Sequence, residues 1–212
     1  AARAVFLNQV HGDGVALLDA GTPDGTEADA CVASAPGAVC TIMVADCLPV
    51  LLAHRSGPVV AAAHAGWRGL AGHSGQGVLE SVFKRFCQEA LVHHASAAIK
   101  NAAIAPDSPY ASEVASHTLA WLGPCIGPQA FEVGPEVREA FMAKDPQAVN
   151  AFEPVGEKYL ADIYQLARQR LNNVGVTQIF GGDRCSFTEK GDFFSYRRDK
   201  TTGRMASFIW LI

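Results

Sequence analysis

The chain lacks an apolar run long enough to cross a membrane. Its most apolar stretch, residues 30–45, contains Pro36 and Gly37 and stops before Asp46. It is therefore shorter than the roughly 20 residues that span a bilayer. Residues 1–15 also lack the basic start, apolar block and small-residue cleavage site of a secretory signal. These absences predict a cytoplasmic protein without a membrane partner.

An excess of positive charge is also missing. The 17 Lys and Arg residues against 21 Asp and Glu give a formal net charge of -4, and no run of basic residues interrupts this balance. Nucleic-acid backbones and anionic membrane surfaces attract basic proteins. We therefore expect no nucleic-acid partner.

Cysteine is sparse and irregularly spaced. The 212 residues include six cysteines and no CxxC pair, which does not favour a disulfide framework. Most of them stand beside Ala, Val or Ile and are interpreted as small buried side chains. Cys47 is the exception considered below.

The sequence is rich in apolar residues. Apolar residues make up 49% of the chain and charged residues 18%, as in a globular protein with a large core. The length allows one large domain or two small ones.

Short valine-rich runs in the first third of the chain predict strands. These runs are 5–7, 15–18, 39–44, 50–53 and 59–63. The last three are almost continuously apolar, which is typical of strands covered on both faces. From residue 78 to 86 the apolar spacing changes to three and four, which predicts a helix packed on the sheet.

The second half of the chain alternates between both kinds of pattern. Residues 93–118 are rich in Ala and Ser and are expected to form a mobile insertion. The further predictions are a strand at 119–123, helices at 135–144 and 157–173 with Tyr159 facing inward, a strand at 176–180, and closing strands at 193–197 and 205–212. Interleaved strands and helices predict an α/β or α+β fold with a mostly buried sheet.

Three candidate metal ligands stand where an apolar run meets a turn: His11, Cys47 and His64. Two imidazoles and one thiolate suit zinc, and three protein ligands with an open fourth position are typical of a catalytic site. The spacings of 36 and 17 positions are not a short-range metal signature. Unrelated buried polar residues are therefore the alternative interpretation.

The neighbours of these residues extend the hypothesis. Gly66-Trp67-Arg68-Gly69 follows His64 between a predicted strand and a predicted helix, so freed backbone N–H groups and Arg68 could bind a phosphate. The alternative is a tight turn whose Arg68 pairs with a surface carboxylate. Asp46 disfavours a free thiolate at Cys47, so a reactive cysteine there needs a metal or a histidine to ionise it.

Five motifs, in order along the chain, carry a resemblance to a known family. They are NQVHG (8–12), ADCLP (45–49), AHAGWRG (63–69), LGPCIGP (122–128) and FFSYRRDKTTGRMASFIWL (193–211). The chain resembles the laccase-domain, or multicopper polyphenol oxidase, family, whose members have also been assigned purine nucleoside phosphorylase and adenosine deaminase activity. The resemblance spans almost the whole chain apart from 93–118.

The resemblance implies a fold and a site. The fold would be a single α/β domain over residues 1–212, a layered sandwich with a largely buried mixed sheet flanked by helices, similar to the cytotoxic necrotizing factor catalytic domain. The family's metal-binding His, Cys, His set maps onto His11, Cys47 and His64. Family members usually carry a further segment before NQVHG, whereas this chain opens at Ala1, so we expect some pocket residues to be missing.

The preferred interpretation is a zinc-dependent enzyme that acts on purine nucleosides. In phosphorolysis, phosphate held by the metal and Arg68 would attack ribose C1′; in deamination, zinc-bound water would attack C6 of adenosine. The expected catalytic residues are Cys47, Asp46 and Arg68, with Asp46 as an orienting residue or proton acceptor. The expected substrate-binding residues are Gln9, Arg68, Tyr196, Arg197 and Arg198, with Phe194 as a further candidate for stacking on the base.

Three alternatives use the same residues. A four-copper oxidase needs more histidines than the seven of this chain, although a single His2Cys copper with Met43 as a weak axial ligand fits a laccase-like polyphenol oxidase. A cysteine hydrolase would use Cys47 as the nucleophile and His11 or His64 as the base. A non-enzymatic protein that binds a small molecule would use the three residues only structurally.

Overall fold

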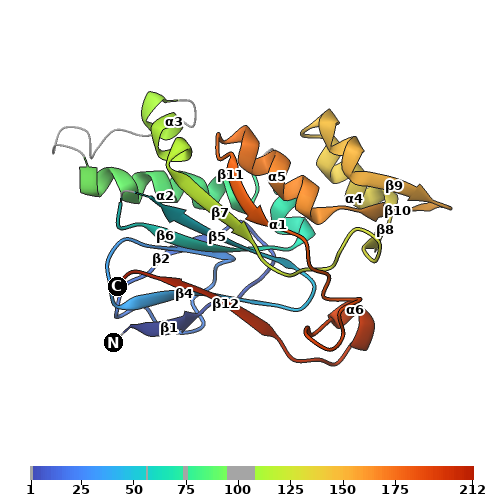
Figure 1. The fold of residues 1–212 in the computed structure, drawn as a ribbon, viewed down its shortest axis with the longest axis horizontal. Helices are drawn as coiled ribbons and strands as arrows, with labels where there is room; N and C mark the ends of the chain where they lie inside the picture. Colours follow the sequence, from blue (N-terminus) through green and yellow to red (C-terminus); the bar gives the residue numbers. More distant parts are fainter. Residues whose placement is uncertain (1, 56, 74–75, 95–107) are drawn as a thin grey trace.

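The computed structural model describes residues 2–55, 57–73, 76–94 and 108–212. The described elements form three layers: helices, a six-stranded sheet and a three-stranded sheet (Figure 1). A mixed α/β fold with a buried mixed sheet is therefore confirmed, but helices cover only one face of that sheet. The likeness to the cytotoxic necrotizing factor domain stays a prediction.

The six-stranded sheet forms the middle layer. Its order is β11-β7-β5-β6-β3-β2. The strands are β2 (Val15–Leu17), β3 (Ala30–Ala33), β5 (Leu48–His54), β6 (Val60–Ala65), β7 (Thr118–Leu122) and β11 (Gln178–Gly181). The end pairs β11/β7 and β2/β3 are parallel, and the inner pairs are antiparallel. Every residue of β3 and β6 is buried, as the continuous apolar run at 59–63 predicts for β6.

The three-stranded sheet covers the other face. It consists of β1 (Arg3–Phe6), β4 (Ala38–Val44) and β12 (Met205–Trp210) in the order β1-β4-β12. Cys40 and Ile42 of β4 pack with Cys31 and Ala62 of the large sheet in one apolar cluster. Met205 pairs with Val44, so the last strand runs beside the end of β4.

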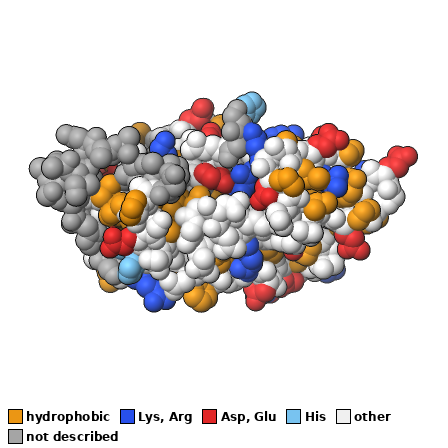
Figure 2. All heavy atoms as spheres, turned by 90° about the horizontal axis from the view of Figure 1, so that it is seen from above, with side chains coloured by type: hydrophobic (Ala, Val, Ile, Leu, Met, Phe, Trp, Pro, Cys, Tyr) orange, Lys and Arg blue, Asp and Glu red, His pale blue; other side chains and the backbone are white. Residues whose placement is uncertain are grey.

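The helices lie on one side of the large sheet, and their buried residues belong to the same core cluster as that face of the sheet (Figure 1). They are α1 (Trp67–Ala71), α2 (Val78–His94), α3 (Pro109–Ser116), α4 (Pro135–Met142) and α5 (Ile163–Asn173), with a 3-10 helix, η1 (Pro146–Ala151). Val78, Leu79, Val82, Phe83 and Phe86 of α2 all lie in the core, which confirms the predicted helical face. Seen from above, this helical side carries basic and acidic side chains interspersed among the described atoms (Figure 2).

Part of the predicted insertion is ordered core structure. Residues 109–116 form α3, which is capped by the Ser108 hydroxyl and buries Ala111, Val114 and Ala115. The prediction of a mobile segment is therefore wrong for this stretch, because small alanine side chains are packing residues here. Residues 95–107 of that prediction lie outside the described residues, whereas residues 93–94 end α2 and Thr118 begins β7.

The predicted helix at 157–173 is wrong in its first turn. Residues Phe152–Val155 (β9) and Lys158–Ala161 (β10) form a hairpin that pairs with Glu132–Val133 (β8), and Tyr159 lies on β10. The helix α5 begins only after Asp162, whose side chain accepts a hydrogen bond from the amide of Gln165. An aspartate cap sets this boundary, which apolar spacing does not reveal.

The predicted strand at 193–197 is also absent. Ser195 caps a short helix, α6 (Tyr196–Asp199), instead. The predicted helix at 135–144 and the strands at 119–123, 176–180 and 205–212 are present, with boundaries that differ by at most two residues.

The cysteines behave as expected. All six are free, and Cys31, Cys40, Cys87 and Cys125 are buried. Among the described residues, no helix is long and apolar enough to cross a membrane.

Candidate active site

His11, Cys47 and His64 come together at one end of the two sheets. One potential ligand atom from each residue lies within 4.8 Å of the others. The Cys47 Sγ is 3.8 Å from Nε2 of His11, and the two imidazole ring centres are 4.7 Å apart. The predicted convergence is therefore present in the fold, although 53 positions separate the first residue from the last.

Two of the three residues lie on connections between the sheets. His11 follows β1 of the small sheet and precedes β2 of the large one, and Cys47 lies between β4 and β5 in the same way. Both connections bend through residues with positive φ, 64° at His11 and 87° at Asp46. Such a conformation is uncommon for residues with a Cβ and costs on the order of 1 kcal/mol or more.

His64 is the second-last residue of β6. Ala63 and Ala65 belong to the core on the helical side and Ala62 to the core between the sheets. Because side chains alternate along a strand, His64 points to the same side as Ala62. It is buried, with an exposed fraction of 3%.

A buried carboxylate, Asp29, orients His64. Nδ1 of His64 is 2.8 Å from Oδ1 of Asp29, and the Asp29 side chain is completely buried. Such a contact fixes the imidazole with Nδ1 protonated and leaves Nε2 available as a ligand.

The same carboxylate fixes the His11 loop. Oδ1 of Asp29 accepts the amide of His11 at 2.9 Å, and Oδ2 accepts those of Val10 and Gly12 at 3.1 and 2.7 Å. Asp29 therefore links two proposed ligands through four hydrogen bonds. Burial alone raises the pKa of Asp29, but the hydrogen bonds from His64, Gly12 and His11 outweigh it and lower that pKa.

The close approach of the ligands requires glycine at position 66. A Cβ there would lie 2.8 Å from Cδ2 of His11 and 3.2 Å from Sγ of Cys47. Gly69 is similarly confined, because a Cβ would lie 2.5 Å from the carbonyl oxygen of Gly12. The glycines of the AHAGWRG motif therefore make room for the loop that carries His11.

Contacts within the site shift the pKa values of Cys47 and His64 in opposite directions. Burial raises the pKa of the Cys47 thiol, but its hydrogen bonds with His11 and His64 outweigh burial and lower that pKa to about 7. For His64, burial lowers the pKa, whereas Asp29 and Cys47 raise it to about 9. A thiolate beside an imidazolium is thus accessible near neutral pH, and a thiolate is the form that binds metal.

The three residues line a pocket of about 650 Å³. Its apolar lining includes Leu7, Met43, Val44, Trp67, Ile126, Phe131 and Ile163, and its polar lining includes Gln9, Asp46, Tyr196, Arg197 and Arg204. A pocket of this size with few polar groups is typical of a small-molecule site.

Two of the predicted site residues in this lining already have hydrogen-bond partners within the protein. Nε2 of Gln9 donates to the Met43 carbonyl at 2.8 Å and Oε1 accepts the Met43 amide at 2.9 Å. Asp46 accepts the Ser186 hydroxyl at 2.7 Å through Oδ1 and the Arg197 amide at 2.6 Å through Oδ2. Both side chains therefore shape the pocket wall.

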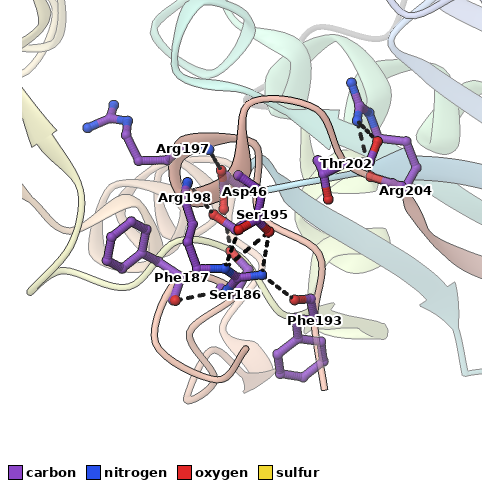
Figure 3. A network of polar contacts seen from close by, with 11 residues as sticks. Asp46, Ser186, Phe187, Phe193, Ser195, Arg197, Arg198, Thr202 and Arg204 are labelled. Carbon is purple, nitrogen blue, oxygen red and sulfur yellow. Dashed lines mark hydrogen bonds and ion pairs between the residues drawn. The ribbon is translucent and has the colours of Figure 1, made fainter. Parts of the chain in front are cut away.

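The Asp46 contacts join the Cys47 loop to the C-terminal segment (Figure 3). In that segment, Arg198 donates to the carbonyl oxygens of Ser186, Phe187 and Phe193. Arg198 therefore holds its own loop together and is absent from the pocket lining. Tyr196 and Arg197 do line the pocket, and Phe194 is exposed and packs near Gly203.

Arg68 does not line this pocket. Its guanidinium stacks on the Trp67 ring at 4.5 Å and lines a neighbouring hollow together with Asp13 and His73. Trp67 and His11 contribute to both cavities. The sequence motif placed Arg68 four residues after His64 in the chain, but in the structure Arg68 lines a hollow whose lining does not include His64.

Sequence reasoning missed two functional candidates. Asp29 directly precedes the buried apolar strand β3, and a carboxylate at the start of such a strand is the signal that could have pointed to it. Arg204 lies in the C-terminal motif but six residues beyond the arginines that were selected.

The chain matches the family model described as multi-copper polyphenol oxidoreductase laccase over residues 1–114 and 96–212. The chain belongs to this family. The membership confirms the resemblance drawn from the five motifs.

Relatives in this family carry a different name. A protein of Escherichia coli K12, called purine nucleoside phosphorylase YfiH, is 56% identical over 210 residues, which cover 99% of this chain and 74% of the relative. A Haemophilus influenzae protein called purine nucleoside phosphorylase is 46% identical over 209 residues, or 97% of this chain and 73% of the relative. The chain thus spans about three quarters of the length of these relatives.

Solved structures share the fold. The crystal structure of the Neisseria meningitidis protein NMB0706 is similar with a TM-score of 0.79 and 42% identity, over 99% of this chain and 75% of that one. The structure of YlmD from Geobacillus stearothermophilus gives a TM-score of 0.72 and 26% identity, over 99% and 73% of the two chains.

Proposed function

We propose that this chain is a zinc-dependent purine nucleoside phosphorylase whose metal is held by His11, Cys47 and His64. The observation that carries the proposal is the convergence of these three ligands within 4.8 Å on the lining of a 650 Å³ pocket. The names of relatives at 56% and 46% identity support an enzyme of this kind.

The donor set fits zinc. Zinc accepts imidazole nitrogen and thiolate sulfur, and three protein ligands leave its fourth position for water or substrate. The buried Asp29 contact holds the His64 tautomer that such a site needs. When bound, the metal would supply Lewis-acid polarisation of a substrate oxygen.

The residues of the chain have distinct roles in this proposal. The apolar lining that includes Phe131 and Ile126 excludes water from the base, and the exposed ring of Tyr196 stacks on it. Arg197 binds phosphate or ribose. Asp46 is a positioning residue, because both of its oxygens hold the loop that carries Tyr196 and Arg197.

In phosphorolysis a phosphate oxygen forms a bond to ribose C1′ as the bond from C1′ to the base nitrogen breaks. The electron pair of the broken bond leaves with the purine, which is protonated at N7. The site must therefore hold a dianion on one side of the sugar and the base on the other. Adenosine deamination, in which water attacks C6, is a further activity that the same metal position would allow.

Single-copper oxidation of phenols is the second candidate. The His2Cys set is also a copper set, and Met43 lines the pocket beside it. A cysteine hydrolase would use the Cys47 thiolate with the Asp29–His64 pair and would need no metal.

One experiment separates these functions. The metal content of the purified protein is measured, and inosine and adenosine turnover is then followed with and without phosphate and a chelator. Zinc at one equivalent with phosphate-dependent release of purine base supports the proposal. Chelator-resistant turnover would favour the hydrolase, and phenol oxidation only with copper would favour the oxidase.

A further inference from the structure

The side chain of Gln9 pairs with β4 as the backbone of a strand would. The last residue pair of the β1/β4 ladder is Phe6 with Thr41. Two residues further along β4, the Gln9 amide donates to the Met43 carbonyl at 2.8 Å and accepts the Met43 N–H at 2.9 Å. A side-chain amide carries the donor and acceptor of a peptide group, so Gln9 extends the ladder beyond the end of β1.

The backbone beside Gln9 has already left β4. Asn8 donates its amide to the Thr26 carbonyl at 2.9 Å, and its own carbonyl accepts the amide of Ala28 at 3.3 Å. The main chain therefore pairs with the segment before β3, and it reaches His11 three residues after Asn8. Gln9 is thus the point at which the segment that carries His11 stays attached to β4.

Two of the three pairs of proposed ligands are joined by contacts already described. Cys47 directly precedes β5, and β5 pairs with β6 in a ladder that places Pro49 opposite His64. This ladder fixes Cys47 relative to His64. The buried carboxylate of Asp29 fixes His64 relative to the His11 loop through its four hydrogen bonds.

The Gln9 contact joins the third pair, His11 and Cys47. Met43 lies on β4 four residues before Cys47, and Gln9 lies two residues before His11. The two hydrogen bonds between Gln9 and Met43 therefore connect the chain segments that end in these two ligands. Each pair of proposed ligands then has a structural link of its own.

The separation that this link accompanies is close to the one that zinc requires. In a tetrahedral site, bonds of about 2.3 Å to sulfur and 2.0 to 2.1 Å to nitrogen place the two ligand atoms about 3.6 Å apart. The Cys47 Sγ and the His11 Nε2 are 3.8 Å apart without a metal. Ligands held near their bound positions lose little conformational freedom when the metal binds.

We propose that Gln9 is a positioning residue of the metal site, which sets His11 relative to Cys47 by pairing with Met43. The inference rests on the proposed function in one respect, that His11 and Cys47 bind the same metal. It gives Gln9 a role different from the substrate contact that the sequence predicts. If a substrate took over the two hydrogen bonds to Met43, the segment that carries His11 would be detached from β4.

Gln9→Met tests this role, because methionine has a similar length but neither the donor nor the acceptor. Gln178→Met is the matched control. The Gln178 amide also donates to a carbonyl, that of Ser116 at 2.9 Å, and accepts from Arg55, but it lies on β11 and outside the pocket lining. The measurements are zinc affinity by chelator competition, the absorption spectrum of the cobalt-loaded protein, and crystal structures of the metal-free variants.

We expect Gln9→Met to bind zinc about 10-fold more weakly than wild type, as for the loss of other residues that orient ligands. In the cobalt protein, the sulfur-to-cobalt charge-transfer band of Cys47 remains, whereas the d–d bands, which report coordination geometry, change. In the metal-free crystal structure, His11 moves away from Cys47 while the 2.8 Å contact between Asp29 and His64 is kept.

A second variant, Gln9→Asn, keeps the polar amide but is one methylene too short to reach Met43, so it is expected to behave like Gln9→Met. Gln178→Met should match the wild type in all three measurements. Zinc affinity within twofold of wild type in both Gln9 variants would overturn the inference. An equal loss in Gln178→Met would do so as well, because the effect would then be one of general stability.

Turnover separates the positioning role from substrate binding. A raised KM for inosine at unchanged zinc affinity would show that Gln9 contacts substrate, and the inference would be wrong. If the wild type binds neither zinc nor cobalt, the proposed function fails. The metal-free crystal structures then still decide the role of Gln9: a displaced His11 in Gln9→Met supports it, and an unmoved His11 refutes it.

Discussion

Replacing Asp29 with asparagine tests how the proposed metal site is held. In the wild type, each carboxylate oxygen accepts two hydrogen bonds: Oδ1 from His11 and His64, and Oδ2 from Val10 and Gly12. Asparagine has the same shape but only one acceptor oxygen. In either orientation its NH2 group faces two N–H donors, so two of the four hydrogen bonds are lost.

The magnitude follows from those two bonds. A hydrogen bond to a charged group contributes about 1.5 to 3 kcal/mol, so Asp29→Asn is expected to cost about 3 kcal/mol or more of stability. That is a large part of the 5 to 15 kcal/mol typical of a folded domain. The freed His64 ring and His11 loop are expected to reduce zinc affinity about 10- to 100-fold.

The assays are urea unfolding and competition for zinc with a chromophoric chelator. Asp145→Asn is the matched control, because Asp145 is a helix cap that accepts the Gln147 amide. Because asparagine caps a helix about as well as aspartate, that control is expected to lose less than about 0.5 kcal/mol of stability and no zinc affinity. Asp29→Asn protein that unfolds at the wild-type urea concentration and binds zinc within threefold of wild type would refute the reasoning.

Three further predictions concern the ligand residues. Gly66→Ala is expected to lose most zinc binding, because the added Cβ would lie 2.8 Å from Cδ2 of His11. Gly191→Ala is the control, since its Cβ would have no atom within 4 Å, and it is expected to bind zinc normally in the same competition assay. Because the pKa of Cys47 is lowered to about 7, alkylation of Cys47 in the metal-free folded protein should be fast above pH 7 and should slow as the pH falls through about 7. In urea, where the protein is unfolded, the midpoint of the alkylation rate should return to about pH 8.5. The same midpoint in the folded and the unfolded protein would contradict the proposed thiolate. Cys47→Ala should abolish both zinc binding and turnover. The control, Cys125→Ala, changes a buried position outside the pocket lining and should alter neither quantity by more than threefold. A Cys47→Ala protein that keeps its zinc but loses turnover would indicate that Cys47 is a nucleophile.

The ligand types and many of the elements followed from the sequence alone. The apolar spacing of α2 and the apolar runs of β4, β5 and β6 predict which residues are buried, because the burial of one helix or strand is visible in a short run of residues. His11, Cys47 and His64 could be selected because ligand chemistry belongs to residue type and each lies where an apolar run meets a turn.

Only the tertiary structure decided what surrounds those ligands. Asp29 acts through four partners on two other segments, and β12 pairs with a strand more than 160 positions earlier in the chain. Arg68 stacks on Trp67 and lines the neighbouring hollow, and no local sequence pattern encodes which of the two cavities it lines. Residue type and position at the end of an apolar run therefore selected the candidate ligands, whereas the packing of distant segments determined the tautomer of His64, the pocket and the arginines that line it.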